Sequence, residues 1–224
     1  MRKIFLPLAL ALSLSMYVYA QQDLIDAANL KRYAQANNQL KKRVVFLGNS
    51  ITEGWARSDS AFFNANNYIG RGISGQTSPQ LLLRFRQDVI ELHPTAVVIN
   101  IGTNDIAENT GHYTPQFTLD CIKSMAELAR YNGIKVILSS VLPVGEYPWR
   151  KEIKDVPLKI DALNARIKSF AESNNFAYID YNTPMRDNSG AMIPTLARDG
   201  IHPTIEGYKV MEKIAKKIID CVIE

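Results

Sequence analysis

The stretch VVFLGNSITEGW, residues Val44–Trp55, decides the fold of this chain. Its first four residues are apolar without alternation, and Gly48 ends the run. Such a run is typical of a short strand buried on both faces, as strands are in parallel sheets covered by helices. We expect a short helix after Gly54, so that the chain turns abruptly from strand to helix around Ser50.

Four further apolar runs follow, and segments with helical spacing separate them. Strands are predicted over residues 68–72, 96–101, 134–142 and 176–180, and an N-terminal helix over 23–41. Apolar helical stripes are formed by Leu82, Phe85 and Val89, by Phe117, Cys121, Met125 and Leu128, by Ile160, Leu163, Ile167 and Phe170, and by Tyr208, Met211, Ile214, Ala215, Ile218, Cys221 and Val222. Five short strands separated by helices imply right-handed crossovers and an α/β fold, with a parallel five-stranded sheet covered on both faces.

Length and composition limit the possible classes of protein. The chain has 224 residues, which suits one sizeable domain over residues 21–224. Apolar residues make up 46% and charged residues 21%, which argues against disorder. Two cysteines exclude a disulfide scaffold and a cysteine-rich zinc site. The three histidines, His93, His112 and His202, are the candidates for a histidine base or metal ligand.

Residues 1–20 have the pattern of a cleaved secretory signal. Arg2 and Lys3 are basic, residues 4–20 are apolar, and Ala20 supplies the small residue at the cleavage position. The alternative is an uncleaved membrane anchor, for which the apolar run is short. We therefore expect a secreted or periplasmic protein with no stable membrane insertion after cleavage. Removal of Arg2 and Lys3 lowers the formal net charge from +4 to +2, too small an excess to predict nucleic acid as a partner.

Glycine and polar residues follow the first three predicted strands and precede the last helix. Ligands bind beyond the carboxyl ends of the strands in such sheets, so we expect these four segments to converge at one edge. The segments contain Gly48, Asn49 and Ser50; Gly72 and Gly75; Gly102, Thr103, Asn104 and Asp105; and Asp199, Gly200, Ile201, His202 and Pro203.

Ser50 is a candidate nucleophile because a turn from strand to helix exposes its hydroxyl at the edge of the sheet. The segment lacks the G-x-S-x-G spacing of the α/β-hydrolase elbow. The alternative is a helix N-cap, in which the Ser50 hydroxyl would accept a backbone hydrogen bond.

His202 is a candidate general base. Pro203 disfavours helical geometry at His202 and suits the first turn of the following helix, so His202 lies on a loop at the start of that helix. Asp199 can reach the other imidazole nitrogen and stabilise the imidazolium. The alternatives are a turn aspartate beside a structural histidine, or a metal site, which lacks a second histidine at ligand spacing.

An acyl-transfer site also needs hydrogen-bond donors for the developing oxyanion. The candidates are the backbone N–H groups of Ser50 and Gly75 and the side-chain amide of Asn104. A glycine at position 75 lets the backbone approach closely without a Cβ clash. The alternatives are an ordinary positive-φ loop at Gly75 and turn chemistry at Asn104.

Taken in order, four segments resemble the SGNH hydrolases, also called GDSL-type esterases and lipases. VVFLGNSITEGW (44–55) resembles the first family block, RGISGQT (71–77) the second, IGTND (101–105) the third and DGIHP (199–203) the last. The resemblance covers roughly residues 43–220 and implies a flavodoxin-like three-layer α/β/α sandwich. It implies the catalytic triad Ser50, Asp199 and His202, and an oxyanion hole made by Ser50, Gly75 and Asn104.

One position departs from the family pattern, since Asn49 stands where the family has the aspartate of its name. Asparagine is nearly isosteric with aspartate and can still accept a hydrogen bond through its amide oxygen. Position 49 belongs neither to the implied triad nor to the oxyanion hole, so we do not interpret Asn49 as a loss of activity. The resemblance implies ester hydrolysis through an acyl-enzyme, without a metal or an organic cofactor.

The loop over residues 142–157 carries Tyr147 and Trp149, and we expect it at the rim of the site. These aromatic rings could stack on a sugar, line an acyl pocket, or pin the loop to the domain. His112 is expected on the surface, and His93 far from the catalytic edge. Cys121 and Cys221 are expected as buried free thiols, because the implied topology places their helices on opposite faces of the sheet.

Three functions fit these residues. The first is an exported serine esterase that releases short acyl groups, acetyl above all, from a carbohydrate. The second is a lysophospholipase or thioesterase acting on longer chains, which would need an acyl groove. The third is a non-catalytic envelope binding module, against which the complete set of catalytic residues argues.

Overall fold

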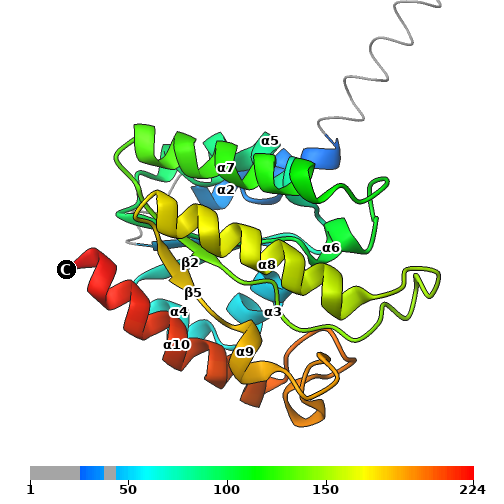
Figure 1. The fold of residues 1–224 in the computed structure, drawn as a ribbon. Coiled ribbons are helices and arrows are strands. Elements are labelled where there is room, and N and C mark those ends of the chain that lie inside the picture. Colours follow the sequence, from blue (N-terminus) through cyan, green and yellow to red (C-terminus); the bar gives the residue numbers. More distant parts are fainter. Residues whose placement is uncertain (1–25, 38–43) are drawn as a thin grey trace, which may run out of the picture.

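The computed structural model describes residues 26–37 and 44–224, and its centre is a five-stranded parallel sheet (Figure 1). The strands are β1 (Val44–Gly48), β2 (Tyr68–Gly72), β3 (Ala96–Asn100), β4 (Lys135–Ser139) and β5 (Ala177–Ile179). They lie in the order β2-β1-β3-β4-β5, and every neighbouring pair is parallel. The predicted α/β fold is confirmed.

Helices cover both faces of the sheet (Figure 1). One face carries α5 (Ser78–Asp88), α7 (Pro115–Tyr131) and α8 (Val156–Ser173), and the other carries α3 (Ser50–Ser58), α4 (Ser60–Ala65), α9 (Asn182–Met185) and α10 (Ile205–Ile223). The shorter elements are η1 (Leu30–Arg32), α2 (Ala34–Asn37), η2 (Ile90–Leu92), α6 (Thr103–Ile106) and η3 (Pro194–Leu196).

The side chains of β1 show why the strand is apolar throughout. Val45 and Leu47 pack into the core beneath α5, α7 and α8, whereas Val44 and Phe46 pack against α3, α4 and α10. All four are buried, as expected when successive side chains point to opposite covered faces. The Phe46 ring meets the Trp55 ring of α3 edge to face, with centroids 5.4 Å apart.

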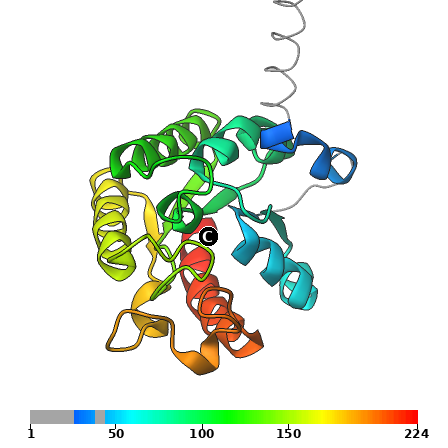
Figure 2. The same cartoon turned by 90° about the vertical axis from the view of Figure 1, so that its right-hand side faces the viewer.

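The strand order determines which edge of the sheet carries the predicted site. The chain runs from β1 to β2 on one side and then returns to β3 on the other side of β1. In the register, Gly48 at the end of β1 faces Gly72 of β2 and Asn100 of β3. The loops after β1 and β3 therefore leave the sheet side by side, and ligands bind in the crevice at such a switch point. Figure 2 turns this edge toward the viewer.

The N-terminal region differs from the predicted helix over 23–41. Asn29 has a left-handed backbone with φ 51°, and the described part is divided into a helical turn over 26–28, η1 and the short α2 instead of one helix. Tertiary contacts override local helix preference here, because the Tyr33 hydroxyl donates to the Gly72 carbonyl and Asn37 donates to Asp88. The rest of this predicted helix lies outside the described residues, as do the predicted signal over 1–20 and its cleavage position.

Several predicted boundaries were also wrong. The helix expected after Gly54 begins at Ser50, and Gly54 lies inside α3. The fourth strand, predicted over 134–142, is only Lys135–Ser139, because Val141 and Leu142 are buried in a loop without joining the sheet. Burial without strand pairing gives the same apolar pattern as a strand. The third and fifth strands are shorter than predicted by one and two residues.

Two helical stripes were partly wrong. In α5, Leu81 is buried in place of Leu82, and Arg84 is completely buried. In α7, Phe117 and Leu128 are exposed, and the buried face is formed by Leu119, Cys121, Ile122, Met125 and Ala126.

Both cysteines are free, on helices that pack on opposite faces of the sheet. Cys121 on α7 is buried as predicted, but Cys221 near the end of α10 is exposed, which corrects the prediction of two buried thiols. Its neighbours Val222 and Ile223 pack, only partly buried, against the core that Met211, Ala215 and Ile219 join, whereas Cys221 itself stays outside it. Across the described segments we find no helix that is both long and apolar enough to cross a membrane.

Candidate active site

Ser50, His202 and Asp199 form a continuous hydrogen-bonded chain at the catalytic edge. The Nε2 atom of His202 lies 2.9 Å from the Oγ atom of Ser50, and its Nδ1 atom lies 2.8 Å from the Oδ2 atom of Asp199. Ser50 is the first residue of α3, and the other two lie on the loop before α10. This is the arrangement in which a histidine deprotonates a serine while a carboxylate fixes the imidazole.

The turn at Asn49 leaves the Ser50 hydroxyl available. Asn49 is the N-cap of α3, since its Oδ1 atom accepts the N–H of Ile51 at 3.0 Å. The interpretation of Ser50 as the N-cap is therefore wrong, and asparagine serves here because an N-cap needs only a side-chain acceptor. Close packing holds the turn, because a Cβ at Gly72 would lie 2.2 Å from the Glu53 nitrogen and 2.5 Å from the Asn49 carbonyl oxygen.

The loop before α10 holds the Asp199 carboxylate toward His202. Its Oδ1 atom accepts the backbone N–H groups of Ile201 at 3.1 Å and His202 at 2.8 Å, which leaves Oδ2 for the imidazole. Partial burial opposes ionisation, but the hydrogen bonds from His202 outweigh it and lower the pKa of Asp199. Asp199 therefore remains a carboxylate at neutral pH, as the partner of an imidazolium must.

Gly75 and Asn104 line the same pocket as Ser50 and His202. Gly75 has φ +78°, a left-handed conformation that favours glycine, and no atom lies within 4 Å of the position a Cβ would take. The positive φ, rather than a steric clash, therefore explains why position 75 is a glycine. Asn104 is buried, and its Nδ2 atom donates one hydrogen to the Gln76 carbonyl at 2.9 Å. An amide nitrogen carries two hydrogens, so a second donor remains for an oxyanion.

The pocket has a volume of about 360 Å³ and sits at the crevice between β1 and β3. Its lining residues are Ser50, Gly54, Arg57, Ser58, Ser74, Gly75, Asn104, Asn109, Trp149, Arg198, Ile201, His202, Pro203 and Tyr208. A larger open groove, of about 810 Å³, lies at the opposite edge around Lys135 and Ala177, where β4 and β5 begin. The predicted catalytic residues do not line that groove.

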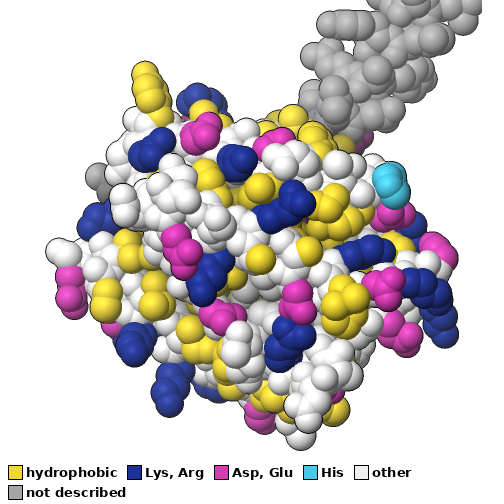
Figure 3. Space-filling model, in the orientation of Figure 1, with side chains coloured by type: hydrophobic (Ala, Val, Ile, Leu, Met, Phe, Trp, Pro, Cys, Tyr) yellow, Lys and Arg dark blue, Asp and Glu magenta, His cyan; other side chains and the backbone are white. Residues whose placement is uncertain are grey.

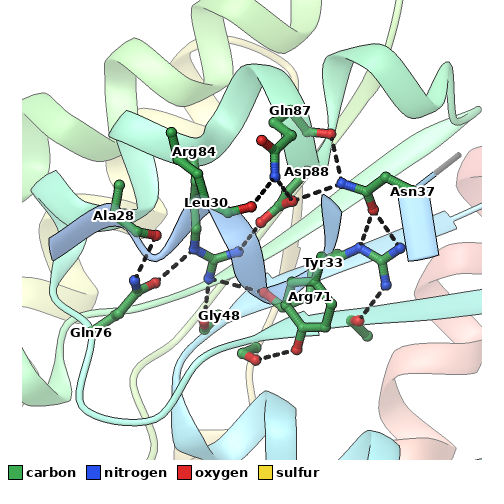
Figure 4. A network of polar contacts seen from close by, with 12 residues as sticks. Ala28, Leu30, Tyr33, Asn37, Gly48, Arg71, Gln76, Arg84, Gln87 and Asp88 are labelled. Atoms are coloured by element: carbon green, nitrogen blue, oxygen red, sulfur yellow. Dashed lines mark hydrogen bonds and ion pairs between the residues drawn. The ribbon is translucent and has the colours of Figure 1, made fainter. Parts of the chain in front are cut away.

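A buried arginine anchors the loop that carries Gly75 (Figure 4). The Arg84 guanidinium donates to the Gln76 Oε1 atom at 2.6 Å and pairs with Asp88 at 2.8 Å. It also donates to the carbonyls of Gly48 at 2.9 Å and Arg71 at 3.0 Å, at the ends of β1 and β2. Because the Gln76 carbonyl orients Asn104, this one side chain connects the strand ends to two of the three predicted oxyanion donors, Gly75 and Asn104.

Two carboxylates hold the same loop from other sides. Glu53 accepts the backbone N–H of Ser74 at 2.9 Å and pairs with Arg32 at 2.6 Å. Asp105 accepts the N–H of Ser78 at 3.0 Å, and it also accepts the hydroxyls of Ser78 and Thr118. Burial raises the pKa of Asp105, and these hydrogen bonds act in the opposite direction.

Sequence reasoning assigned no role to Arg84, Gln76, Glu53 or Asp105. Glu53, Gln76 and Asp105 lie inside the family blocks, which was the signal available for them. A charged residue within a helical stripe offered only a weak signal for Arg84.

The remaining candidates lie apart from the reacting groups. Tyr147 is fully buried, and its hydroxyl lies 3.1 Å from the Thr103 hydroxyl, so it pins the loop to the domain. Trp149 is half exposed, lines the pocket, and donates to Asn109. His112 is exposed and contacts Glu108, and His93 ends η2 at the entrance to β3. No set of three His, Cys, Asp or Glu side chains suited to a metal ion occurs within residues 26–37 and 44–224.

Comparison with known proteins supports a single family. Residues 46–210 match the model of the GDSL-like lipase/acylhydrolase family. A crystal structure of a GDSL-like lipase from Bacteroides thetaiotaomicron is 56% identical, with a TM-score of 0.85 over 87% of this chain and 98% of the other.

The similar proteins with named substrates are more distant. An acetylxylan esterase from Xylanibacter ruminicola is 23% identical over 88% of this chain. This chain spans about half of that esterase, 47% of its length. An acetylxylan esterase from Geobacillus stearothermophilus is 24% identical over 65% of this chain and 68% of the esterase. A solved structure of an acetylxylan esterase from Geobacillus stearothermophilus, with a TM-score of 0.64 and 20% identity over 80% of this chain and 94% of the other, shares the fold.

Proposed function

Since this chain belongs to the GDSL-like lipase/acylhydrolase family and is a carboxylic ester hydrolase, we propose that it is an exported serine esterase that removes short acyl groups, acetyl above all, from a carbohydrate. The observation that carries the proposal is the Ser50–His202–Asp199 chain of hydrogen bonds, with contacts of 2.9 and 2.8 Å. Gly75 and Asn104 face the same pocket.

The first half of the proposed reaction forms an acyl-enzyme. The Ser50 oxygen attacks the acyl carbonyl carbon as its proton passes to His202 Nε2. The oxyanion receives hydrogen bonds from the N–H groups of Ser50 and Gly75 and from the Asn104 amide. The bond from carbon to the alkoxy oxygen then breaks, and His202 gives its proton to the departing alcohol.

The second half regenerates the enzyme. A water molecule takes the place of the alcohol and loses a proton to His202 as its oxygen attacks the acyl-enzyme carbonyl. The same donors hold the second oxyanion. The bond to Ser50 breaks, the carboxylic acid is released, and the proton on His202 returns to the Ser50 oxygen.

The preference for a short acyl group and a sugar alcohol rests on the pocket and on the distant relatives. The pocket is modest in volume, and its wall includes polar groups from Ser58, Ser74 and Asn109. The indole of Trp149 at its rim offers a face on which a sugar ring can stack. Two of the distant relatives are acetylxylan esterases. Export is proposed on the pattern of residues 1–20, which lie outside the part of the chain that the structure describes.

Hydrolysis of p-nitrophenyl esters from acetate to palmitate, with the Ser50→Ala variant beside wild type, tests the proposal. We expect a rate maximum at acetate and a loss of about 10⁶-fold in kcat in the variant, because Ser50 forms the covalent intermediate. A maximum at long chains would favour the lysophospholipase or thioesterase function instead. If wild type and variant were equally inert, the serine mechanism would be wrong, and a glycan-binding function would take its place.

A further inference from the structure

The wall of the catalytic pocket carries positive charge without matching negative charge. Arg57 and Arg198 line it, and among its described lining residues there is no aspartate or glutamate. Two carboxylates that neighbour lining residues in the chain are already engaged, since Asp199 binds His202 and Glu53 binds Arg32 and Ser74. On the face that Figure 3 shows, by contrast, acidic and basic side chains are interspersed.

Arg57 is placed by the same helix as the nucleophile. Ser50, Gly54 and Arg57 follow one another on α3 at spacings of four and three residues, and all three line the pocket. Seven residues of helix separate the Cα atoms of Ser50 and Arg57 by about 10 Å along the axis. Helical side chains lean toward the N-terminus, so the Arg57 side chain leans toward Ser50. Between them Gly54 leaves room for the Tyr208 hydroxyl, which would lie 2.6 Å from a Cβ at position 54.

Arg198 flanks the pocket from the loop before α10. Its backbone N–H donates to the His202 carbonyl at 2.8 Å, so the arginine is held beside the base. Its guanidinium is exposed and approaches Asp199 only to 3.8 Å. Tyr208 lines the pocket together with the two arginines. Burial raises the pKa of its hydroxyl, and the positive charges of both Arg198 and Arg57 oppose that rise.

Arg57 forms no ion pair or side-chain hydrogen bond with any other described residue. A guanidinium stays charged at every physiological pH and binds carboxylate and phosphate oxygens through paired N–H donors. Two such groups at one concave site also concentrate anions there.

We propose that the esterase acts on acyl esters whose alcohol part carries an anionic group, a carboxylate or a phosphate, bound by Arg57 and Arg198. This inference rests on the proposed function and names the substrate class of the same site. The acyl group faces Gly75 and Asn104, and the anion lies toward the far end of α3, about two helical turns from Ser50.

The test compares the mono-O-acetylated methyl glycosides of glucuronic acid, of its uncharged amide and of glucose 6-phosphate. The first two are matched in shape and differ in charge, and the third carries a phosphate in place of the carboxylate. We expect kcat/KM to be about fivefold higher for a charged glycoside than for the amide, mainly through KM, as suits partly exposed charge pairs. Added salt should reduce this ratio. The carboxylate and phosphate arms show which anion the pocket prefers.

Variants connect the charge preference to the two arginines. In the Arg57→Gln/Arg198→Gln double variant, the ratio of charged to uncharged kcat/KM should fall to about one, whereas Arg86→Gln, at an exposed arginine on α5, should keep the wild-type ratio. Both substrates are measured on the same variant. Any effect of the Arg198 substitution on the catalytic triad therefore changes both kcat/KM values equally and cancels in their ratio. A wild-type ratio of one, or a ratio that persists in the double variant, would overturn the inference.

Neutral p-nitrophenyl acetate separates failure of this inference from failure of the proposed function. Wild-type enzyme that hydrolyses p-nitrophenyl acetate but shows no charge preference remains a serine esterase with a different substrate. Wild-type enzyme that is inert toward this ester and every glycoside overturns both the inference and the proposed function.

Discussion

The two sides of the catalytic pocket are built in opposite ways. The loop with Gly75 is anchored by Arg84, whose side chain is 0% exposed, through hydrogen bonds to the ends of two strands. The loop with Asp199 and His202 is open to solvent, with side chains 44% and 24% exposed. Oxyanion donors act through fixed positions, whereas a general base must exchange protons with an alcohol and with water. The buried network therefore fixes the loop whose N–H donors must stay in place, and the loop with the general base is left open to water.

Among variants that compare these two loops, the largest effect should come from the exposed side. Asp199→Asn keeps the shape of the side chain but stabilises the wrong imidazole tautomer, so we expect kcat to fall about 10⁴-fold. Thermal unfolding should change little, because this residue is partly exposed. Steady-state kinetics on p-nitrophenyl acetate measures the effect. Asp155→Asn, at an exposed aspartate before α8, serves as the control, and equal rates in the two variants would contradict the role of Asp199.

The next effect concerns stability on the buried side. Arg84→Met leaves the Asp88 carboxylate buried without its partner, so the free energy of unfolding should fall by about 3–5 kcal/mol. Arg86→Met, on an exposed face of the same helix, should change it by less than about 0.5 kcal/mol. Urea denaturation measures both values. Adding Asp88→Leu to Arg84→Met should recover part of the loss, and equal stability of the two single variants would show that the buried network does not hold this side.

The third-largest effect should come from the loss of an oxyanion donor. Asn104→Ala should retain the fold and lower kcat by about 10²–10³-fold, the usual cost of one oxyanion-hole donor. Circular dichroism and ester hydrolysis check the two parts, with Asn188→Ala at an exposed loop position as the matched control. Turnover close to wild type would remove Asn104 from the oxyanion hole.

The smallest effect should be a pH dependence of stability at Glu53. Burial opposes its ionisation, but hydrogen bonds from Ser74 and the charge of Arg32 lower the pKa of Glu53 below its ordinary value of 4.5. A lowered pKa in the folded state stabilises the fold above the unfolded pKa, and this contribution disappears as the pH falls through the folded value.

Glu53→Gln should therefore be less stable than wild type at neutral pH, by under about 1 kcal/mol. The difference should shrink as the pH falls below about 4.5. Thermal unfolding between pH 7 and pH 3 measures it. A difference that stays constant over this range would mean that ionisation of Glu53 does not hold the Ser74 loop.

Much of the exposed side could be predicted from the sequence, because its residues are close along the chain. Pro203 restrains His202, and Asp199 lies only three residues away, so local geometry suffices. Ser50 and Asn104 could be placed at one edge because parallel strands end together.

The buried side could not be predicted in the same way. Arg84 contacts the ends of two strands more than ten residues away, and its place within a helical stripe indicates only weakly that its charge is buried. The helix prediction for the N-terminal segment was wrong for a related reason. Tertiary hydrogen bonds of Tyr33 and Asn37 determine the local structure there, in place of helical preference. Periodicity identified the elements, but a polar side chain that satisfies distant carbonyls has no periodic signal.

The loop between β4 and α8 has a consequence for protein engineering. It brings Trp149 to the rim of the pocket, and the buried Tyr147 anchors it through Thr103, at a point separate from Ser50, Gly75 and His202. Grafting a longer or differently charged segment beyond Tyr147 would reshape the entrance while the reacting groups keep their own supports. Such a loop is a natural place to diversify a library of variants toward new alcohols.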